Sequence, residues 1–421
     1  MKLVNAEIIT VGDEILYGQI LDTNSQWISK ELDAIGIKAI RKTTVPDVEA
    51  DILESFEQAG NRADIILITG GLGPTSDDLT KPCLASFFDC ELILSKPALK
   101  DLQKIFDKLG REITETNRQQ AYLPEKCTMI SNRVGTASGM WFQENGKVYV
   151  SMPGVPHEMK IMMTEQILPK LQSVFQTPVI YHKLIKTIGI GESWLADKIS
   201  SWEHQLPDHI KLAYMPGLGE VRLRLTAIGK DLVRLQEDVA DQVKRLQLLA
   251  GEFIYGFDKD TLPMVIGRSL TSKGLTISTA ESCSGGSVAK SLTSTSGSSR
   301  YFTGSVIAYH NRIKETLLGV KPETLINFGA VSEETVIEMA ENVRTNLKTD
   351  IGLATSGIAG PDGGSEEKPV GTIWVACADH QKTVTKKLSL YKDRCANIEL
   401  TTQAVLNLLR QRLAEMDGEK A

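Results

Sequence analysis

The chain has 421 residues, of which 42% are hydrophobic and 24% are charged, with a formal net charge of -6 and a pI near 5.7. This is the composition of a globular protein large enough for two or three domains. Its acidic balance provides no basic field to hold a nucleic-acid backbone, so we expect no nucleic-acid partner.

The amino terminus and the cysteines predict a cytoplasmic protein. The opening residues MKLVNAEIITVGDEI contain an apolar run broken by Glu7, which is typical of a first strand rather than a signal peptide. No apolar run approaches the roughly 20 residues of a membrane helix, so no membrane contact is expected. The six cysteines form no CxxC pair, which argues against a zinc site or a disulfide framework.

Strand-like and helix-like segments alternate through residues 1–172, the predicted first domain. The runs EIITVG, NSQWISKELDAIG, ADIILITGG and DDLTKPCLASFF follow one another, and several end in glycine loops. This order predicts a doubly wound α/β sheet that binds ligands at the carboxyl ends of its strands.

One loop of this domain, TGGLGPTSDDLT (residues 69–80), suits phosphate binding. Its glycines allow close backbone approach, and its amides can cradle phosphate. It is not a Walker A loop, because no Gly-Lys-Ser/Thr ends it. Asp77 and Asp78 suit a divalent cation that bridges to phosphate oxygens, although Asp77 could instead cap a helix beginning at Leu79. Asp13 and Glu14 lie where a further carboxylate would be needed.

Residues 178–256 predict a small α+β domain with the order strand, helix, strand, strand, helix. In GEVRLRLTA, Val221, Leu223 and Leu225 alternate with Arg222 and Arg224, as in a half-buried strand. Pro263 marks the first turn of a new helix, so a third domain is expected over residues 260–421.

The third domain opens with the strand LTIS, followed by the loop TAESCSGG and the helix-like stretch SVAKSL. A glycine loop before a helix can hold an anion and present a nucleophile. Ser282 and Cys283 are the two candidates. The thiol, with a pKa near 8.5, needs less activation than the hydroxyl. Adjacent loop residues point apart, so only one should face the substrate, and we favour Ser282.

A serine nucleophile needs a base, and two residues just after the second strand, YFTGSVIAY, are candidates, with Tyr309 at the end of that strand able to relay a proton or orient the base. His310 could serve, but a lone histidine there is typical of a polar strand end. Lys314, about one turn into the next helix, and Tyr309 could face the same crevice. Bringing a lysine pKa from about 10.4 to near 7 costs about 4 to 5 kcal/mol. Lys314 must therefore be desolvated or lie near a cation such as Arg300 or Arg312.

The remaining segments again alternate. Ser332 is predicted to cap the helix EETVIEMAENVRTNL, and DIGLATSGIAGPDGG predicts a strand and a loop. GTIWVACA and TVTKKLSLY predict a hairpin, and NIELTTQAVLNLLRQRL predicts a closing helix. Two α/β domains with separate glycine loops favour two sites rather than one.

Several motifs carry a family resemblance. TGG-x-G, the GDE loop and MPGVPHEM (residues 152–159) resemble molybdopterin-binding proteins. The fuller pattern, with Leu72, Pro74, the doubled aspartates and NRVGTASG (residues 132–139), resembles the CinA family over the whole chain. The resemblance implies a molybdopterin-binding-like domain acting as an ADP-ribose pyrophosphatase, a KH-like middle domain and a nicotinamide mononucleotide deamidase domain. Two enzymatic domains joined by a small one favour a homodimer.

For the first domain, the resemblance implies metal-assisted hydrolysis of ADP-ribose to AMP and ribose 5-phosphate. A divalent metal (Mg, Mn or Co) would be held by Asp78 and Asp77. The same loop could instead bind a pterin-like phosphate ligand without this chemistry. The expected substrate-binding residues are Gly12, Asp13, Glu14, Asn24, Gly70, Gly71, Gly73, Thr75, Gly135, Thr136, Pro153 and Gly154.

For the third domain, AESCSGG, SVIAYHNRIK, TSGIAGPDGG and KPVGTIWVA resemble the deamidase. Its implied reaction is hydrolysis of nicotinamide mononucleotide to nicotinic acid mononucleotide and ammonia, without a cofactor. The catalytic residues map to Ser282, Tyr309 and Lys314. Relatives carry a second arginine after Asp393-Arg394 that this chain lacks, which leaves a phosphate role for that helix open. The expected binding residues are Glu281, Cys283, Gly285, Gly286, Gly357, Gly360, Gly363 and Gly364.

The alternative is a non-enzymatic partner protein in DNA uptake or repair. GIGE (residues 189–192) and GLGE (residues 217–220) do not supply the basic GxxG loop that clamps nucleotides in KH domains. A chain with only one active site is a further alternative.

Overall fold

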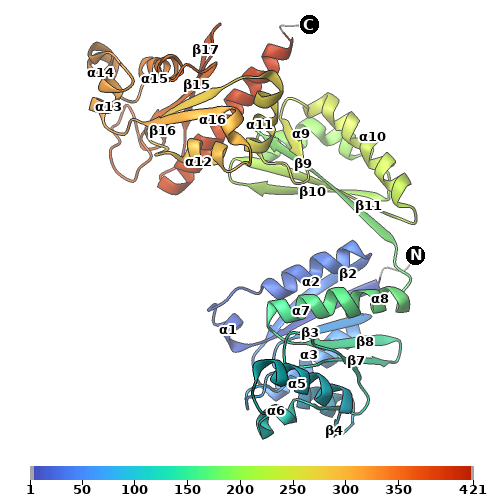
Figure 1. The fold of residues 1–421 in the computed structure, drawn as a ribbon. Coiled ribbons are helices and arrows are strands. Elements are labelled where there is room, and N and C mark those ends of the chain that lie inside the picture. The colour runs from blue at the N-terminus through green and yellow to red at the C-terminus, as the bar shows by residue number, and fades with distance from the viewer. Residues whose placement is uncertain (1–3, 419–421) are drawn as a thin grey trace. The chain divides into compact units, whose positions relative to one another are not determined.

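The computed structural model describes residues 4–418 (Figure 1). The chain divides into two compact units. The first comprises the residues up to Tyr181 together with Ala227–Gln236, and the second comprises His182–Thr226 and the residues from Glu237 onward. Among the described residues, no helix is both long and apolar enough to cross a membrane.

The first unit contains a six-stranded sheet in the order β2-β1-β3-β8-β7-β6. The first four of these strands are parallel, and β7 and β6 are antiparallel additions at one edge. The predicted doubly wound sheet is therefore present with a mixed edge. The strands are β1 (Val4–Val11), β2 (Ile37–Val45), β3 (Ile65–Thr69), β6 (Thr128–Ile130), β7 (Gly139–Glu144) and β8 (Lys147–Met152), beside the separate pair β4 (Leu92–Leu94) and β5 (Tyr122–Pro124).

Helices cover both faces of this sheet, because each face has its own apolar cluster. On one face lie α2 (Thr23–Ala34), α7 (Pro156–Met162), the π-helical turn Met163–Ile167 and α8 (Leu168–Val174). On the other lie α3 (Glu49–Arg62), α4 (Thr80–Phe87) and α5 (Lys96–Leu109). Two short helices, α1 (Asp13–Leu16) and α6 (Glu115–Gln119), belong to loops around the strand ends. Asp22 caps α2, since its carboxylate accepts a hydrogen bond from the amide of Ser25.

The middle segment has the predicted order of elements. Its four strands form a sheet in the order β10-β11-β9-β12. In β11, Val221, Leu223 and Leu225 are buried and Arg224 is exposed, which confirms the alternation. The elements are β9 (Val179–Ile188), α9 (Glu192–Glu203), β10 (Ile210–Gly217), β11 (Glu220–Gly229), α10 (Leu232–Ala250) and β12 (Ile254–Phe257).

The carboxy-terminal domain is a three-layer α/β structure around a sheet in the order β14-β13-β15-β16-β17. Its strands are β13 (Ile277–Glu281), β14 (Phe302–Ile307), β15 (Ile351–Gly357), β16 (Thr372–Ala378) and β17 (Thr383–Ser389). One face packs on α11 (Leu262–Lys273), α12 (Ser287–Thr293) and α16 (Arg394–Gly418), and the other on α15 (Glu333–Asn346). The predicted hairpin β16–β17 and the Ser332 cap of α15 are confirmed. The short helices α13 (Asn311–Thr316) and α14 (Pro322–Phe328) follow β14.

Candidate active sites

Strand β13 carries the first site to the carboxyl end of the carboxy-terminal sheet. It is buried along its whole length and pairs in parallel with β14 on one side and β15 on the other. The amide of Ser282 continues this pairing by donating to the carbonyl of Thr355 at 3.0 Å. The backbone of the serine loop is therefore fixed by the central strand of the sheet.

The last residue of β13, Glu281, is fully buried and anchors the start of α12. Its carboxylate accepts hydrogen bonds from the amides of Gly286 at 2.9 Å, Val288 at 3.0 Å and Ala289 at 2.7 Å. The hydroxyl of Ser284 donates to it at 2.8 Å. The side chain thus accepts hydrogen bonds from the amides that a helix start would otherwise offer to an anion.

This arrangement places three predicted binding residues differently from expectation. The amide of Gly286 donates to Glu281, and that of Gly285 donates to the carbonyl of Ser282 at 3.1 Å. The structure therefore gives the two glycines and Glu281 a role in holding the loop, where we had expected contact with a ligand.

Lys314 from α13 lies against the predicted nucleophile. Its Nζ is 3.1 Å from Ser282 Oγ and donates to the carbonyl of Ala308 at 2.7 Å. The lysine is only 1% exposed, and this burial lowers its pKa below the ordinary lysine value. The sequence required Lys314 to be either desolvated or close to a cation, and its burial meets the first of these conditions. A neutral amine could accept the proton of Ser282 while still donating to Ala308.

The rival residues are less suited to catalysis. Cys283 is buried, and burial raises the pKa of its thiol to about 12, so the thiol stays protonated at neutral pH. His310 is exposed and caps α13, where its Nδ1 accepts the amide proton of Arg312 at 3.1 Å. The geometry therefore supports Ser282 as the nucleophile and Lys314 as the base.

A cavity of about 210 Å³ opens onto the serine and the lysine. Tyr309 lies on its wall and is more than half exposed. The guanidinium of Arg394, in the first turn of α16, donates to the Tyr309 hydroxyl at 2.8 Å and to the carbonyl of Gly360 at 2.7 Å. Since Tyr309 accepts from Arg394, its own proton can be donated elsewhere.

The cavity also contains residues that were not predicted. Asn311 and Arg394 line it, beside Gly357, which was predicted. The sequence did contain Asp393-Arg394 as a candidate, but the local pattern could not place that helix beside Tyr309. Gly363 and Gly364 are exposed and do not belong to its lining.

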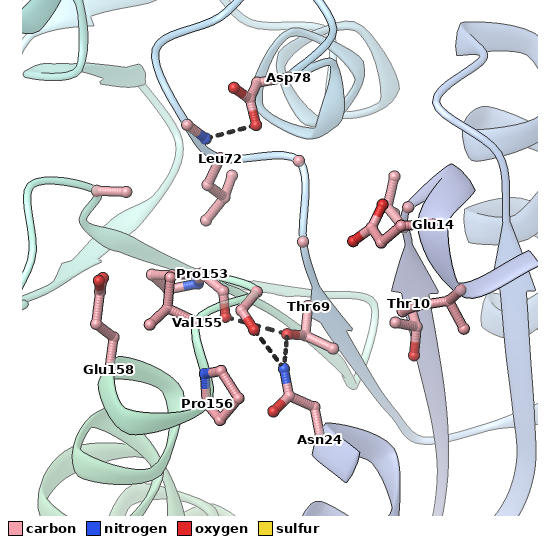
Figure 2. A pocket seen from close by; sticks show the side chains of 18 of the residues that line it. Thr10, Glu14, Asn24, Thr69, Leu72, Asp78, Pro153, Val155, Pro156 and Glu158 are labelled. Atoms are coloured by element: carbon pink, nitrogen blue, oxygen red, sulfur yellow. Dashed lines mark hydrogen bonds between the residues drawn. The ribbon is translucent and has the colours of Figure 1, made fainter. Parts of the chain in front are cut away.

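The second site is a pocket of about 520 Å³ at the carboxyl ends of β1 and β3 in the first unit (Figure 2). Glu14 and Thr10 lie on one side of it, and Glu158 and Val155 lie across from them. Of the predicted residues, Asp13, Thr75 and Gly135 do not line it. Those that do are Gly12, Glu14, Asn24, Gly70, Gly71, Gly73, Asp77, Asp78, Thr136, Pro153 and Gly154.

Asp78 holds the glycine loop together. Its Oδ1 accepts from the amide of Gly73 at 2.7 Å (Figure 2). Its Oδ2 accepts from both the amide (2.9 Å) and the hydroxyl of Thr75. Helix α4 begins at Thr80, and no side chain caps it, so the alternative that Asp77 caps this helix is wrong. Asp77 is exposed on the rim of the pocket.

Asn24 joins three segments of the first unit by hydrogen bonds. Its Nδ2 donates to the Thr69 hydroxyl at 3.3 Å and to the carbonyl of Gly154 at 2.7 Å, while Thr69 donates to the carbonyl of Pro153 at 3.1 Å (Figure 2). These bonds join α2, β3 and the loop after β8 at the floor of the pocket. Gly154 and Asn24 were predicted, whereas the role of Thr69 was not.

Carboxylates gather at one end of this pocket. Burial raises the pKa of Asp47, and the negative charges of Asp13, Glu14 and Asp77 raise it further, against the lowering effect of the amide of Asp13, which donates to it at 3.1 Å. Within residues 4–418, no group of three or more His, Cys, Asp or Glu side chains is placed to hold a metal ion by itself. The donor set fits a cation such as Mg²⁺, which takes one or two carboxylates and completes its shell with water and substrate phosphates.

Comparison with known proteins matches three segments of the chain to known families. Residues 7–173 match the family described as "Probable molybdopterin binding domain", residues 182–256 the damage-inducible protein CinA KH domain, and residues 259–413 the CinA C-terminal domain. The chain is 51% identical to a CinA-like protein of Cytophaga hutchinsonii over 98% of its own length and 99% of that protein. It belongs to the CinA family.

Two further relatives extend the comparison. A CinA-like protein of Flavobacterium psychrophilum is 44% identical over 96% of this chain and 98% of its own length. The crystal structure of a competence/damage inducible protein from Agrobacterium tumefaciens is 36% identical; the match covers 36% of this chain and 93% of that one, with a TM-score of 0.36.

Proposed function

We propose that the carboxy-terminal domain hydrolyses the carboxamide of nicotinamide mononucleotide to give nicotinic acid mononucleotide and ammonia. The observation that carries this proposal is the buried contact between Lys314 Nζ and Ser282 Oγ at 3.1 Å. A serine beside a desolvated amine is one arrangement that activates a nucleophile for amide hydrolysis without a metal. The choice of substrate follows from the resemblance of the surrounding motifs to the deamidase family.

The side chains divide the reaction between them. Ser282 Oγ attacks the carboxamide carbon as Lys314 takes its proton, and Lys314 then delivers that proton to the departing ammonia. Water attacks the resulting ester with the same lysine as base, which releases the carboxylate and restores Ser282. Tyr309, held by Arg394, donates a hydrogen bond to a substrate oxygen and keeps its proton throughout.

Ammonia release from nicotinamide mononucleotide, measured with a chelator present, tests this proposal. The wild-type chain should release one ammonia for each nicotinic acid mononucleotide formed, and Ser282→Ala should release none above background. A wild-type chain without this activity would contradict the assignment.

We also propose that the first domain hydrolyses ADP-ribose to AMP and ribose 5-phosphate. This second function is favoured by the pocket in which a glycine loop, held by Asp78, faces a group of carboxylates. Asp77, with Asp47 as a second carboxylate, would share a divalent cation (Mg, Mn or Co) with the diphosphate. Asp78, the other metal ligand expected from the sequence, has both carboxylate oxygens bound to its own loop. The cation would neutralise phosphate charge, and the loop amide of Gly71 would bind a phosphate oxygen, since the amide of Gly73 already donates to Asp78. Chromatography of the products formed with and without added metal tests this activity.

Two alternatives make different predictions. If the pocket only binds a pterin-like phosphate, ADP-ribose will survive incubation with metal. If the chain acts on DNA as a non-enzymatic partner, it will bind DNA or RNA at submicromolar concentration with steep salt dependence. The absence of nucleic-acid binding and the homodimer both stay predictions.

A further inference from the structure

Gln120 is a buried side chain with unused hydrogen-bonding capacity in the amino-terminal pocket. It follows α6, is 4% exposed and lines the pocket of about 520 Å³. Neither its Oε1 nor its Nε2 has a hydrogen-bond partner within residues 4–418. Buried carboxamides in native proteins are almost always paired, so two unpaired atoms facing a cavity indicate a ligand.

The surroundings of Gln120 differ from the carboxylate end of the pocket. Its neighbour Ala121 belongs to an apolar cluster that also contains Leu72 and Ala137, and these last two residues line the same pocket. An uncharged carboxamide among apolar side chains suits an uncharged, flat group better than a phosphate.

The chemistry of the carboxamide narrows the ligand further. It offers one acceptor, Oε1, beside one pair of donors on Nε2. A phosphate only accepts and would leave Oε1 unpaired. A base edge with an amino donor next to a ring-nitrogen acceptor pairs with both atoms, as adenine does with glutamine.

We propose that Gln120 is a specificity residue that binds the 6-amino group and an adjacent ring nitrogen of an adenine base. This inference rests on the proposed nucleotide hydrolysis in the same pocket. It places the base at the end of the pocket near Leu72 and Ala137, and the diphosphate at the glycine loop.

Titration calorimetry on the full chain tests the inference without requiring turnover. AMP is compared with purine riboside 5′-monophosphate, which lacks the 6-amino group, and with ribose 5-phosphate, which lacks the base. The wild type should bind AMP about 10- to 100-fold more tightly than the purine riboside nucleotide. Gln120→Met, which keeps the volume but not the hydrogen bonds, should reduce this ratio to about twofold or less and leave ribose 5-phosphate binding unchanged.

Gln119 provides the matched control, because it is the preceding glutamine and is exposed. Gln119→Met should leave both dissociation constants unchanged. Gln120→Glu is a second, nearly isosteric variant that keeps an acceptor and loses the donor; it should also weaken AMP binding, and it serves if the methionine variant does not fold.

Equal wild-type affinities for AMP and the purine riboside nucleotide would overturn the inference, as would an unchanged ratio in a folded Gln120 variant or no measurable AMP binding. If instead the wild type binds AMP with the expected preference but leaves ADP-ribose intact, the base-recognition role of Gln120 holds and the proposed hydrolysis fails.

Discussion

At the scale of single residues, the proposed reaction of the carboxy-terminal site depends on the protonation of Lys314. Burial lowers the pKa of this amine, so it loses its proton at a lower pH than an exposed lysine does. Only the neutral form can take the proton of Ser282. Below the lowered pKa the enzyme should therefore be inactive.

The first prediction concerns pH. Deamidase kcat/KM should rise as pH increases through the pKa of Lys314 and level off below the ordinary lysine value. Lys314→Met should reduce kcat by roughly 10²- to 10⁴-fold and abolish this rise. Initial rates across a pH series measure both effects. Lys290→Met, at an exposed lysine on α12, is the control and should keep the wild-type profile.

The second prediction separates the two adjacent nucleophile candidates. Ser282→Ala should abolish the deamidase, whereas Cys283→Ala should retain activity within about fivefold, because the buried thiol has a pKa of about 12 and stays protonated. Ammonia release by both variants is the measurement. Activity that survives in Ser282→Ala and disappears in Cys283→Ala would make the cysteine the nucleophile.

How much of the site could be predicted from the sequence depends on how far apart the contacting residues lie along the chain. Ser282 and Lys314 are 32 residues apart, but each lies in its own recognisable motif, so their pairing could be predicted. The contact between Tyr309 and Arg394 spans 85 residues, and no local pattern indicates it. Gln120 was not predicted at all, since a glutamine after a short helix carries no signal until the fold buries it.

At the scale of elements, α12 depends on an internal carboxylate for its start. Five donors converge on Glu281: the hydroxyls of Thr279 and Ser284 and three backbone amides within residues 286–289. A seven-residue helix makes few hydrogen bonds of its own, so this contact matters for its stability.

The third prediction follows from that contact. Glu281→Gln offers only one oxygen to these donors and turns an amide group toward the others. Hydrogen exchange of the amides of Gly286, Val288 and Ala289 should become roughly ten- to hundredfold faster. Mass spectrometry of the α12 peptide measures the change.

Glu334→Gln provides the control for this prediction. Glu334 is an exposed residue in the first turn of α15, whose cap is Ser332. The substitution Glu334→Gln should leave the hydrogen exchange of α15 nearly unchanged. Unaltered exchange of α12 in Glu281→Gln would show that the carboxylate is not what holds the helix.

The elements themselves were largely predictable, because periodicity and capping residues are local signals. Strand alternation in β11, the Ser332 cap and the β16–β17 hairpin were all predicted. The antiparallel edge strands β6 and β7 were not, since sheet order depends on contacts between distant segments. The structural role of Asp78 was not predicted for a different reason. Its partners lie in its own loop, but the bonds between them depend on a loop conformation that the sequence does not reveal.

At the scale of the whole molecule, the two sites belong to separate compact units with different chemical requirements. The lining of the amino-terminal pocket includes several carboxylates, whereas the carboxy-terminal cavity is lined by a serine, a lysine and an arginine. A single preparation should therefore show two activities that respond independently to the same reagent.

The fourth prediction uses a chelator. EDTA should abolish ADP-ribose hydrolysis, and added Mg²⁺ or Mn²⁺ should restore it, while ammonia release from nicotinamide mononucleotide should stay unchanged. Asp47→Asn should reduce only the first activity, and Ser282→Ala only the second. Loss of both activities with EDTA, or in either variant, would contradict independent sites.

Strand β13 has a consequence for how the family can vary in length. Glu281 and Ser282 are consecutive, and the pairing of the strand with β14 and β15 fixes which of them turns toward α12 and which toward Lys314. Inserting or deleting one residue between Ile277 and Ser282 would exchange these positions. An alignment of relatives should therefore show no gaps in this segment, whereas the exposed stretch over residues 361–367 can gain or lose residues freely.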